Sequence, residues 1–381
     1  MTDPPETAGS DIARFSRSRK KIGKGALRLQ GIESIETDND DSRRSVPIRE
    51  AAKALRQGGL VAFPTETVYG LGGDAENPSA VERIFSTKGR PADHPLIVHI
   101  PGPGQLERWA REIPPEAWKL AERHWPGPLT LILRKSDRIP GVVTGGQDTV
   151  GLRVPDHPVA LALLKEFGGA IAAPSANRFG RVSPTTSAHV REEFGNTLDC
   201  ILDGGPCRVG IESTILDLSA NRPRLLRPGA ITVPEIESLL GLSVSMPGND
   251  APRAPGRMRS HYAPNTPVFL IPAAQMEAET LRRLAGGQRV AVLAMSPPPL
   301  PGDCFHHSMP DTPAGWAREL YARLRTLDRQ RFDCILVEMP PAELAWQAVR
   351  DRLDRASSSG TPAGDNKPVD PNKGSSGTPS S

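Results

Sequence analysis

The sequence predicts two α/β domains, a larger one with a mixed sheet and a smaller one with a parallel sheet. Short buried apolar runs alternate with segments of helical periodicity over residues 46–240. The same alternation returns after residue 267 with strand–helix–strand spacing, which favours parallel strands. Between the two, residues 241–267 are rich in Pro, Gly and Arg, which is typical of a connector.

The larger domain begins with a helix, because apolar residues recur at helical spacing from Ile48 to Leu55 before Gly58-Gly59 ends the pattern. A second helix starts at Asn77-Pro78, where a capping residue precedes a proline at the first helical position. We expect further helices near 104–111, 115–124, 161–167 and 188–194, and strands at 60–63, 95–100, 129–133, 149–154, 170–173, 200–203 and 212–218.

The smaller domain has predicted strands at 268–271, 289–294 and 334–339, with helices that end near Leu284, Leu327 and Arg355. The sequence lacks GxGxxG and P-loop motifs, so we expect a Rossmann-like sheet without a dinucleotide site. Residues 1–45 and the segment from 357 onward contain few core-forming residues and are expected to be disordered tails.

Composition excludes several classes of protein. The 381 residues carry a net charge of +3, so no global field recruits nucleic acid or membrane. No apolar run approaches the ~18 residues of a spanning helix. The N-terminus also lacks the apolar core of a secretory signal, which predicts a cytoplasmic protein outside the membrane. The four cysteines show no metal-binding spacing, so we expect them to be reduced and expect no metal site.

The first candidate site follows the strand at 60–63. Thr65 comes directly after this buried strand, and strand ends carry ligands in α/β sheets. Gly70, Gly72 and Gly73 would then let the backbone approach a ligand closely. The alternative is an ordinary turn that leads into the next helix.

The second candidate is the sequence Lys-Gly-Arg-Pro at residues 88–91. Lys88 and Arg90 lie at a helix C-terminus, where their charges could simply complement the helix dipole. Gly89 and Pro91 fix the backbone around them, however, which indicates that the charges are aimed at a ligand. An arginine fork and a lysine point charge together suit a polyphosphate.

Polar residues also interrupt three apolar strands. His99 alternates with Val98 and Ile100 and therefore faces away from the core side of its neighbours. Thr130 and Arg153 lie within strands of their own, where a charged side chain either faces solvent or lines a cleft.

The loop at 173–186 is rich in small hydrogen-bonding side chains, namely Ser175, Asn177, Ser183, Thr185 and Thr186. They either bind a polar ligand or cap a helix, with Ser183 or Thr185 as the cap. Ser213 and Arg227 follow at later strand ends. No Ser/His/Asp order and no acidic metal cage appear, so catalysis should depend on placing phosphates and neutralising charge. These features predict an adenylate made from ATP and a small carboxyl-bearing substrate.

The motifs PTETVYGLG, KGRP, PLIVHI, WPGPLT, VGLRVP, APSAN, ESTI and LRPG occur in this order across about residues 46–240, and HYAPNTP follows in the connector. In these motifs the chain closely resembles the threonylcarbamoyl-AMP synthase family in its long two-domain form. The resemblance implies a YrdC-like twisted mixed sheet with helices around an open basic cleft, plus a smaller Rossmann-like parallel-sheet domain. The expected organisation is a tail at 1–45, the catalytic domain at 46–240, the connector at 241–267, the C-terminal domain at 268–356 and a tail at 357–381.

The resemblance also implies an activity. Members of this family are nucleotidyltransferases that form L-threonylcarbamoyladenylate and diphosphate from L-threonine, bicarbonate or CO2, and ATP. A downstream tRNA threonylcarbamoyltransferase uses the product to form N6-threonylcarbamoyladenosine at position 37 of tRNAs that read ANN codons. We expect Mg²⁺ to be held mainly by the ATP phosphates, no organic prosthetic group, and at most a weak contact with tRNA.

Roles carry over onto matching positions of this sequence. Lys88 and Arg90 are expected to hold the triphosphate and to be catalytic. The resemblance assigns the nucleotide to Thr130, Ser175, Asn177, Ser183, Arg227 and Tyr262, and the threonine and carbamate to Thr65, His99, Arg153 and Ser213. Tyr262 lies in the connector and would reach back to cover the site.

Two features depart from the family pattern. His94 stands where many relatives carry Asn, and residues 342–350 replace a glycine-containing turn that the family pattern places before the last helix. Residues 1–45 lie outside the resemblance. The main alternative function is a YrdC-like module that binds RNA without adenylate synthesis, but the aromatic content is only 4% and no RNA-stacking motif appears. A hydrogenase-maturation carbamoyltransferase would need zinc-finger and acylphosphatase-like segments, for which this chain has neither the length nor the cysteines.

Overall fold

The computed structural model describes residues 41–248, 250–256, 262–296 and 304–357 of the chain. The tails predicted at 1–45 and 357–381 lie outside these ranges, apart from 41–45 and residue 357. The first helix, α1 (Asp41–Arg56), begins inside the predicted N-terminal tail. Proline is most common in the first turn of a helix, so Pro47 favours a start near residue 46, but the helix extends further upstream.

The larger domain is built on a ten-stranded sheet, counted over the described residues. In spatial order its strands are β10 (Arg224–Arg227), β9 (Thr214–Asp217), β5 (Leu129–Lys135), β6 (Thr149–Arg153), β3 (Ile97–His99), β7 (Ile171–Ala172), β2 (Gly70–Asp74), β1 (Val61–Phe63) and β8 (Cys200–Ile201), with β4 (Ala110–Arg111) paired to β5. The pairs β1–β8, β3–β6 and β5–β9 are parallel and the others are antiparallel. The predicted mixed sheet is confirmed.

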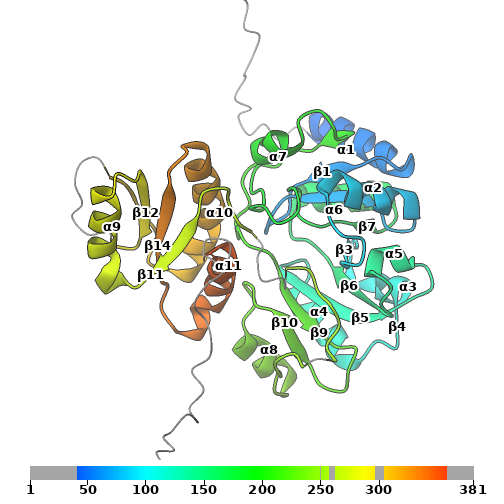
Figure 1. Ribbon diagram of the computed structural model, residues 1–381. Coiled ribbons are helices and arrows are strands. Elements are labelled where there is room, and N and C mark those ends of the chain that lie inside the picture. The colour runs from blue at the N-terminus through cyan, green and yellow to red at the C-terminus, as the bar shows by residue number, and fades with distance from the viewer. Residues whose placement is uncertain (1–40, 249, 257–261, 297–303, 358–381) are drawn as a thin grey trace, which may run out of the picture. The chain divides into compact units, whose positions relative to one another are not determined.

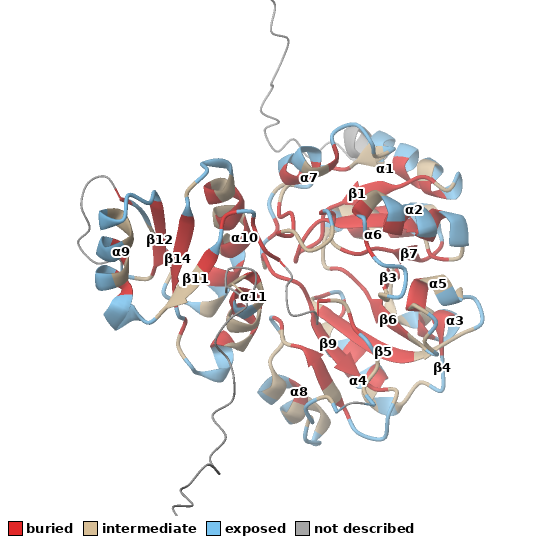
Figure 2. Ribbon diagram, viewed as in Figure 1, coloured by how far each residue is buried: buried red, intermediate tan, exposed pale blue. Residues whose placement is uncertain are grey.

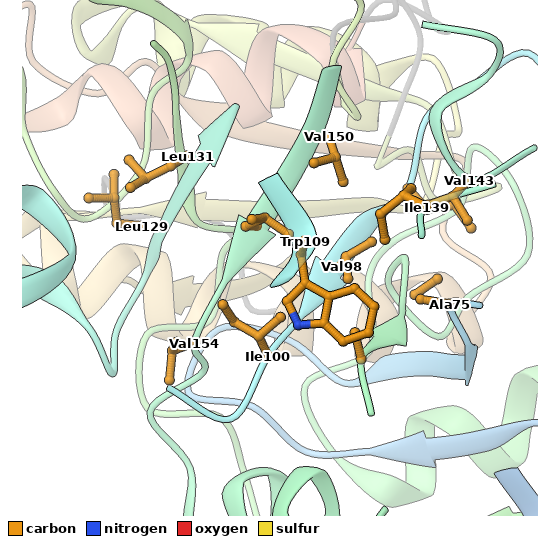
Figure 3. Packing of buried hydrophobic residues seen from close by; sticks show 14 of the residues in the cluster. Ala75, Val98, Ile100, Trp109, Leu129, Leu131, Ile139, Val143, Val150 and Val154 are labelled. Carbon is orange, nitrogen blue, oxygen red and sulfur yellow. The ribbon is translucent and has the colours of Figure 1, made fainter. Parts of the chain in front are cut away.

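Helices cover both faces of this sheet. On one face, α1 and α6 (Pro158–Phe167) pack on Val61, Phe63 and Ile171. The other face carries the larger core, in which Trp109 lies among aliphatic side chains from several strands (Figure 3). The remaining helices of this domain are α2 (Pro78–Lys88), η1 (Pro103–Gln105), α3 (Leu106–Trp109), α4 (Pro115–His124), α5 (Gly141–Thr144), α7 (Ser187–Phe194) and α8 (Val233–Leu240).

The start and end of α2 follow the predicted signals. The Asn77 side chain accepts hydrogen bonds from the backbone N–H groups of Ser79 and Ala80, as expected for a cap before a proline. Gly89 ends the helix with φ of 63°, in the left-handed region that favours glycine. This turn sends the chain from Lys88 to Arg90 with a sharp change of direction.

The glycine-rich segment after Thr65 forms strand β2, where the sequence predicted either a close backbone approach to a ligand or an ordinary turn. A Cβ atom at Gly72 would lie 2.6 Å from the Ile171 side chain and 2.8 Å from that of Phe63. A Cβ atom at Gly73 would lie 3.3 Å from the Leu60 side chain, a less severe but still tight contact. These two glycines therefore leave room for core side chains, and of the three only Gly70 lines the pocket described below.

The smaller domain has a four-stranded parallel sheet, which confirms the predicted architecture. Its order is β11 (Val268–Ile271), β14 (Cys334–Glu338), β12 (Val290–Ala294) and β13 (Phe305–Ser308), the last of which was not predicted. Helix α9 (Met276–Ala285) covers one face, and α10 (Pro313–Arg329) and α11 (Gln347–Ser357) cover the other (Figure 1). Two short 3-10 turns, η2 (Ala273–Gln275) and η3 (Leu344–Trp346), complete it.

The central strands of both sheets are buried, as Figure 2 shows. Strands β12 and β14 alternate their side chains between two cores, one against α9 and one against α10 and α11. Among the described residues, the four cysteines are free, and no helix is long and apolar enough to span a bilayer.

Candidate active site

A pocket lies where strand ends of the larger domain meet the connector. It contains about 540 Å³ of empty space. Its lining comprises Thr65, Thr67, Val68, Gly70, Arg90, Ile97, His99, Arg153, Ala173, Pro174, Ser175, Glu212, Arg227, Pro255, Gly256 and Tyr262. Seven of the predicted site residues are therefore brought together: Thr65, Arg90, His99, Arg153, Ser175, Arg227 and Tyr262. The other five, Lys88, Thr130, Asn177, Ser183 and Ser213, are not part of this lining.

Arg153 forms one corner of the pocket at the end of β6. Its guanidinium lies 2.7 Å from the Glu66 carboxylate and donates to the Thr67 hydroxyl at 2.9 Å. The Thr65 hydroxyl lies 2.8 Å from that of Thr67 and donates to the backbone carbonyl of Val68 at 2.6 Å. The loop after β1 is thus folded around the arginine, and both ions of the Glu66–Arg153 pair are buried.

His99 lies in β3 beside this corner. Its neighbours Val98 and Ile100 belong to the main core, while His99 lines the pocket, as its alternation in the sequence indicated. Burial, reinforced by the nearby Arg153 charge, lowers the pKa of His99 to about 3, so the imidazole is neutral at physiological pH. Its Nδ1 atom has no hydrogen-bond partner among the described residues and can therefore meet a ligand.

Arg90 projects into the pocket just after the Gly89 turn. One guanidinium nitrogen donates to the backbone carbonyl of Pro95 at 3.0 Å, and the group lies 5.7 Å from the centre of the Phe179 ring. Its Nε has no hydrogen-bond partner among the described residues. Burial lowers the pKa of Arg90 to about 10, which leaves it charged at neutral pH. Arg90 is therefore a buried cation whose N–H donors are only partly hydrogen-bonded to protein acceptors.

Lys88 has a different environment from Arg90. Its ammonium is buried and donates to two backbone carbonyls, that of Ser175 at 2.6 Å and that of Asn177. Burial, and secondarily the charge of Arg90, lowers the pKa of Lys88 well below its usual value. Lys88 therefore holds the backbone of the 175–177 loop through hydrogen bonds and is not itself part of the pocket lining.

Arg227 holds the opposite wall. Its Nε donates to the backbone carbonyl of Ser213 at 3.0 Å and one Nη donates to the Ser213 hydroxyl at 3.2 Å. The Ser213 hydroxyl in turn lies 2.8 Å from that of Thr130. Burial lowers the pKa of Arg227. Thr130 and Ser213 thus form a second layer that orients Arg227.

The connector closes the pocket over Arg227. The second Nη of Arg227 donates to the backbone carbonyl of Pro255 at 3.2 Å. At Gly256, where φ is 81°, an added Cβ would overlap the Tyr262 hydroxyl and approach the Arg227 guanidinium. Tyr262 is almost fully buried, and its own backbone has a φ of 64°. A non-glycine residue in this region is held there by its surroundings.

Ser183 binds within the protein and does not cap a helix. Its hydroxyl donates to the Glu212 carboxylate at 2.6 Å, and Thr186 caps α7 by accepting from the His189 backbone. The sequence had indicated Ser183 or Thr185 as the alternative cap, and both were wrong. The cap lies one residue further along because α7 begins at Ser187.

Sequence reasoning missed Glu66. It counted both Thr65 and Thr67 as well placed for binding and noted Glu212 beside Ser213, but it gave no specific role to Thr67 or Glu212. A single sequence does not reveal that Glu66 pairs with Arg153 or that Glu212 pairs with Arg352. The available signal was their position beside assigned residues at strand ends.

His94 lies at the rim, next to Arg90. Its ring is 5.4 Å from the Phe179 ring in an edge-to-face arrangement. Burial and the Arg90 charge lower the pKa of His94 below its usual value. Among the described residues, no three His, Cys, Asp or Glu side chains gather as a metal-binding group would.

These observations define a class of protein. An α/β domain whose strand ends converge on a pocket lined by arginines, hydroxyls and a neutral imidazole is an anion-binding enzyme domain of the YrdC-like type. A family model described as "Telomere recombination" (Sua5_yciO_yrdC) matches residues 53–229, and one described as "Threonylcarbamoyl-AMP synthase, C-terminal domain" (Sua5_C) matches residues 231–358. The chain belongs to the threonylcarbamoyl-AMP synthase family.

Individual relatives agree with this membership. The chain is 45% identical to the threonylcarbamoyl-AMP synthase of Pyrococcus abyssi over 321 residues, which cover 81% of this chain and 94% of that protein. It is 40% identical to the Bacillus subtilis protein of the same name over 336 residues, covering 85% and 96%. The crystal structure of P. abyssi Sua5 complexed with L-threonine superposes with a TM-score of 0.77 at 44% identity, covering 82% of this chain and 94% of that one.

Proposed function

We propose that this chain joins L-threonine, bicarbonate or CO2, and ATP into L-threonylcarbamoyladenylate and releases diphosphate. The observation that carries the proposal is the convergence of Arg90, Arg153 and Arg227 on one pocket. Relatives that match nearly their whole length to this chain carry the corresponding name, and P. abyssi Sua5 has been crystallised in complex with L-threonine.

The charge distribution suits this chemistry. The amine of threonine adds to CO2 and loses a proton to give a carbamate, whose oxygen attacks the α-phosphate as diphosphate leaves. Two anions must approach each other, so fixed cations lower the barrier most where charge develops. The hydroxyls of Thr65 and Thr67 are engaged in local hydrogen bonds, which favours a binding role over a nucleophilic one.

We assign the nucleotide to the side of the pocket formed by Arg90, Arg227 and Tyr262. Arg90 offers a guanidinium with unused donor capacity, which suits the triphosphate. Lys88 adds positive charge beneath the loop that carries Ser175 and Asn177. Thr130 and Ser183 would support this side through the hydroxyl layer behind it.

We assign threonine and its carbamate to the corner formed by Thr65, His99 and Arg153. Ser213, which the resemblance also assigns to threonine, lies behind the lining and would act through Arg227. Arg153 is oriented by Glu66 and Thr67, so its remaining donors can meet a carboxylate. The neutral His99 offers an Nδ1 acceptor to an N–H or O–H group of the substrate. Pro255, Gly256 and Tyr262, which line the pocket, would help to shield a mixed carbamic–phosphoric anhydride from water.

Mg²⁺ is expected to enter with ATP and to be held mainly by the phosphates and water, because the described residues offer no acidic cage. The product would pass to a tRNA threonylcarbamoyltransferase, since the adenylate is an activated acyl donor. Direct tRNA contact would at most be weak, given the net charge of +3.

The test is an incubation of the full chain with ATP, bicarbonate and labelled L-threonine. Diphosphate release that requires both threonine and bicarbonate, with a labelled adenylate product, is the expected result. Omission of either substrate is the internal control. RNA binding without turnover would instead support the alternative of a binding module and would overturn the proposal.

Gly256→Ala is expected to raise KM for ATP about tenfold, because a left-handed φ and a clash with Tyr262 together cost ~1–3 kcal/mol. Gly241→Ala is the matched control: Gly241 also has a positive φ, of 68°, but no atom within 4 Å of its added Cβ. Steady-state kinetics on both variants checks this. Equal effects of the two substitutions on KM would show that the clash over the pocket is unimportant.

A further inference from the structure

Glu212 is a buried carboxylate in the pocket wall, and its partners come from both domains. From the larger domain, the Ser183 hydroxyl donates to Oε1 at 2.6 Å. From the smaller domain, the Tyr321 hydroxyl and Nε of Arg352 each donate to Oε2 at 2.9 Å. Arg352 also donates to the backbone carbonyl of Glu212 at 3.2 Å. Helices α10 and α11 of the smaller domain therefore fix a residue that lines the pocket.

The charges of this cluster are balanced across the domains. Burial alone would raise the pKa of Glu212, but the guanidiniums of Arg352 and Arg227 and the hydrogen bond from Ser183 hold it at about 2. Arg352 has no exposed side-chain surface. A buried ion is costly without its partner, so the Glu212–Arg352 pair couples the two domains, in addition to the Asp351 carboxylate beside Arg352 and the Arg227 charge near Glu212.

The same two side chains of the smaller domain also contact the connector. The guanidinium of Arg352 lies 5.5 Å from the centre of the Tyr262 ring, within range of a cation–π interaction. The rings of Tyr262 and Tyr321 are 5.7 Å apart. Since Tyr262 has a left-handed backbone and its hydroxyl abuts Gly256, contacts on its ring help to keep the connector over the pocket.

A short path leads from this cluster to the cations of the site. Glu212 precedes Ser213, whose carbonyl and hydroxyl orient Arg227, and Arg227 holds the Pro255 carbonyl. A displacement of Glu212 would therefore shift Arg227 and the closing segment together.

We propose that Arg352 and Tyr321 are positioning residues through which the C-terminal domain sets the ATP side of the pocket, acting on Glu212 and Tyr262. The inference deepens the proposed function and rests on it for the identity of the ligand. On this inference the smaller domain contributes to the site, because without it Glu212 would lose its ion pair with Arg352 and keep only Ser183 and the nearby Arg227 charge.

The test uses the full chain with Tyr321→Phe, Arg352→Lys, Arg352→Met, Glu212→Gln and the double variant Glu212→Gln/Arg352→Met. Arg350→Met is the matched control, because Arg350 lies on the same helix and its guanidinium donates to the backbone carbonyl of Ala342. For each protein we would measure kcat, KM for ATP, and the melting temperature.

Tyr321→Phe and Arg352→Lys are each expected to raise KM for ATP about tenfold, because each loses a hydrogen bond to the Glu212 carboxylate. The same loss should lower the melting temperature by no more than about 10 °C, so both variants should remain folded at the assay temperature. The control is expected to match wild type. Arg352→Met removes the ion-pair partner of Glu212 and can impair folding. The double variant therefore also removes the negative charge of Glu212. If the two residues are coupled, Arg352→Met should lower kcat/KM at least about fivefold less in the Glu212→Gln protein than in wild type.

Wild-type KM and kcat in both Tyr321→Phe and Arg352→Lys would overturn the inference, and so would fully additive effects of Glu212→Gln and Arg352→Met. Calorimetric titration with ATP separates this outcome from failure of the proposed function. If wild type binds ATP without releasing diphosphate, equal ATP affinity in all variants overturns the positioning role, and weaker affinity in Tyr321→Phe and Arg352→Lys supports it. If wild type does not bind ATP, both proposals fall.

Discussion

Replacing Arg90 with alanine is expected to lower kcat/KM for adenylate formation about 10²- to 10³-fold, the usual effect of removing one pre-placed donor from developing charge. Among the described residues, its guanidinium has one hydrogen bond, to the Pro95 carbonyl, lies 5.7 Å from the centre of the Phe179 ring, and has no partner at Nε. The cost of burying this cation is therefore compensated only in part by the protein. We expect the unused N–H donors of Arg90 to bind the triphosphate.

The same reasoning predicts that the Arg90→Ala protein keeps its stability. Removing an incompletely paired buried charge does not leave an opposite charge unpaired, so we expect a melting temperature within about 3 °C of wild type. Arg178→Ala is the matched control, because Arg178 is exposed on the nearby loop and stacks on Phe194. Wild-type kcat/KM in Arg90→Ala, measured as diphosphate release, would refute the assigned role; a large loss in Arg178→Ala would show that the effect is not specific to the pocket.

Much of the fold could be predicted because its local signals agree with its packing. The apolar runs at 129–133 and 149–154 became β5 and β6, and Asn77 caps α2 as expected. Strand β2 was missed because GLGGD lacks the β-branched and aromatic residues typical of strands. Its glycines are explained only by tertiary packing, in which Phe63 and Ile171 occupy the space of the absent side chains.

The candidate site, like the fold, was predicted only in part. Arginines and hydroxyls at strand ends were recognised because polar groups are costly to bury without a purpose. The sequence could not show how far each side chain lies from the pocket surface. Lys88, Thr130 and Ser183 were therefore assigned to the nucleotide, although each of them hydrogen-bonds to protein groups behind the pocket lining. Acidic partners such as Glu66 and Glu212 depend on pairings between distant segments, which periodicity and spacing do not record.

Lys88→Met is expected to affect stability and activity together, unlike Arg90→Ala. Methionine has nearly the length of lysine but cannot donate, so the carbonyls of Ser175 and Asn177 would lose the ammonium that both now accept. An unsatisfied buried acceptor costs about 1–3 kcal/mol, partly offset here because the lysine no longer has to be desolvated. We expect the free energy of unfolding to fall by about 2 kcal/mol in urea titrations.

Activity should fall at least ~100-fold in the same variant, because the loop that faces the pocket loses its support and a positive charge disappears from beneath it. Ser175→Ala is the control for stability, since Lys88 binds the backbone carbonyl of Ser175 and that carbonyl is retained. Its unfolding midpoint should match wild type. Loss of activity in Lys88→Met with an unchanged midpoint would mean that Lys88 acts on the phosphates without supporting the loop. An unchanged midpoint with unchanged activity would remove Lys88 from the site altogether.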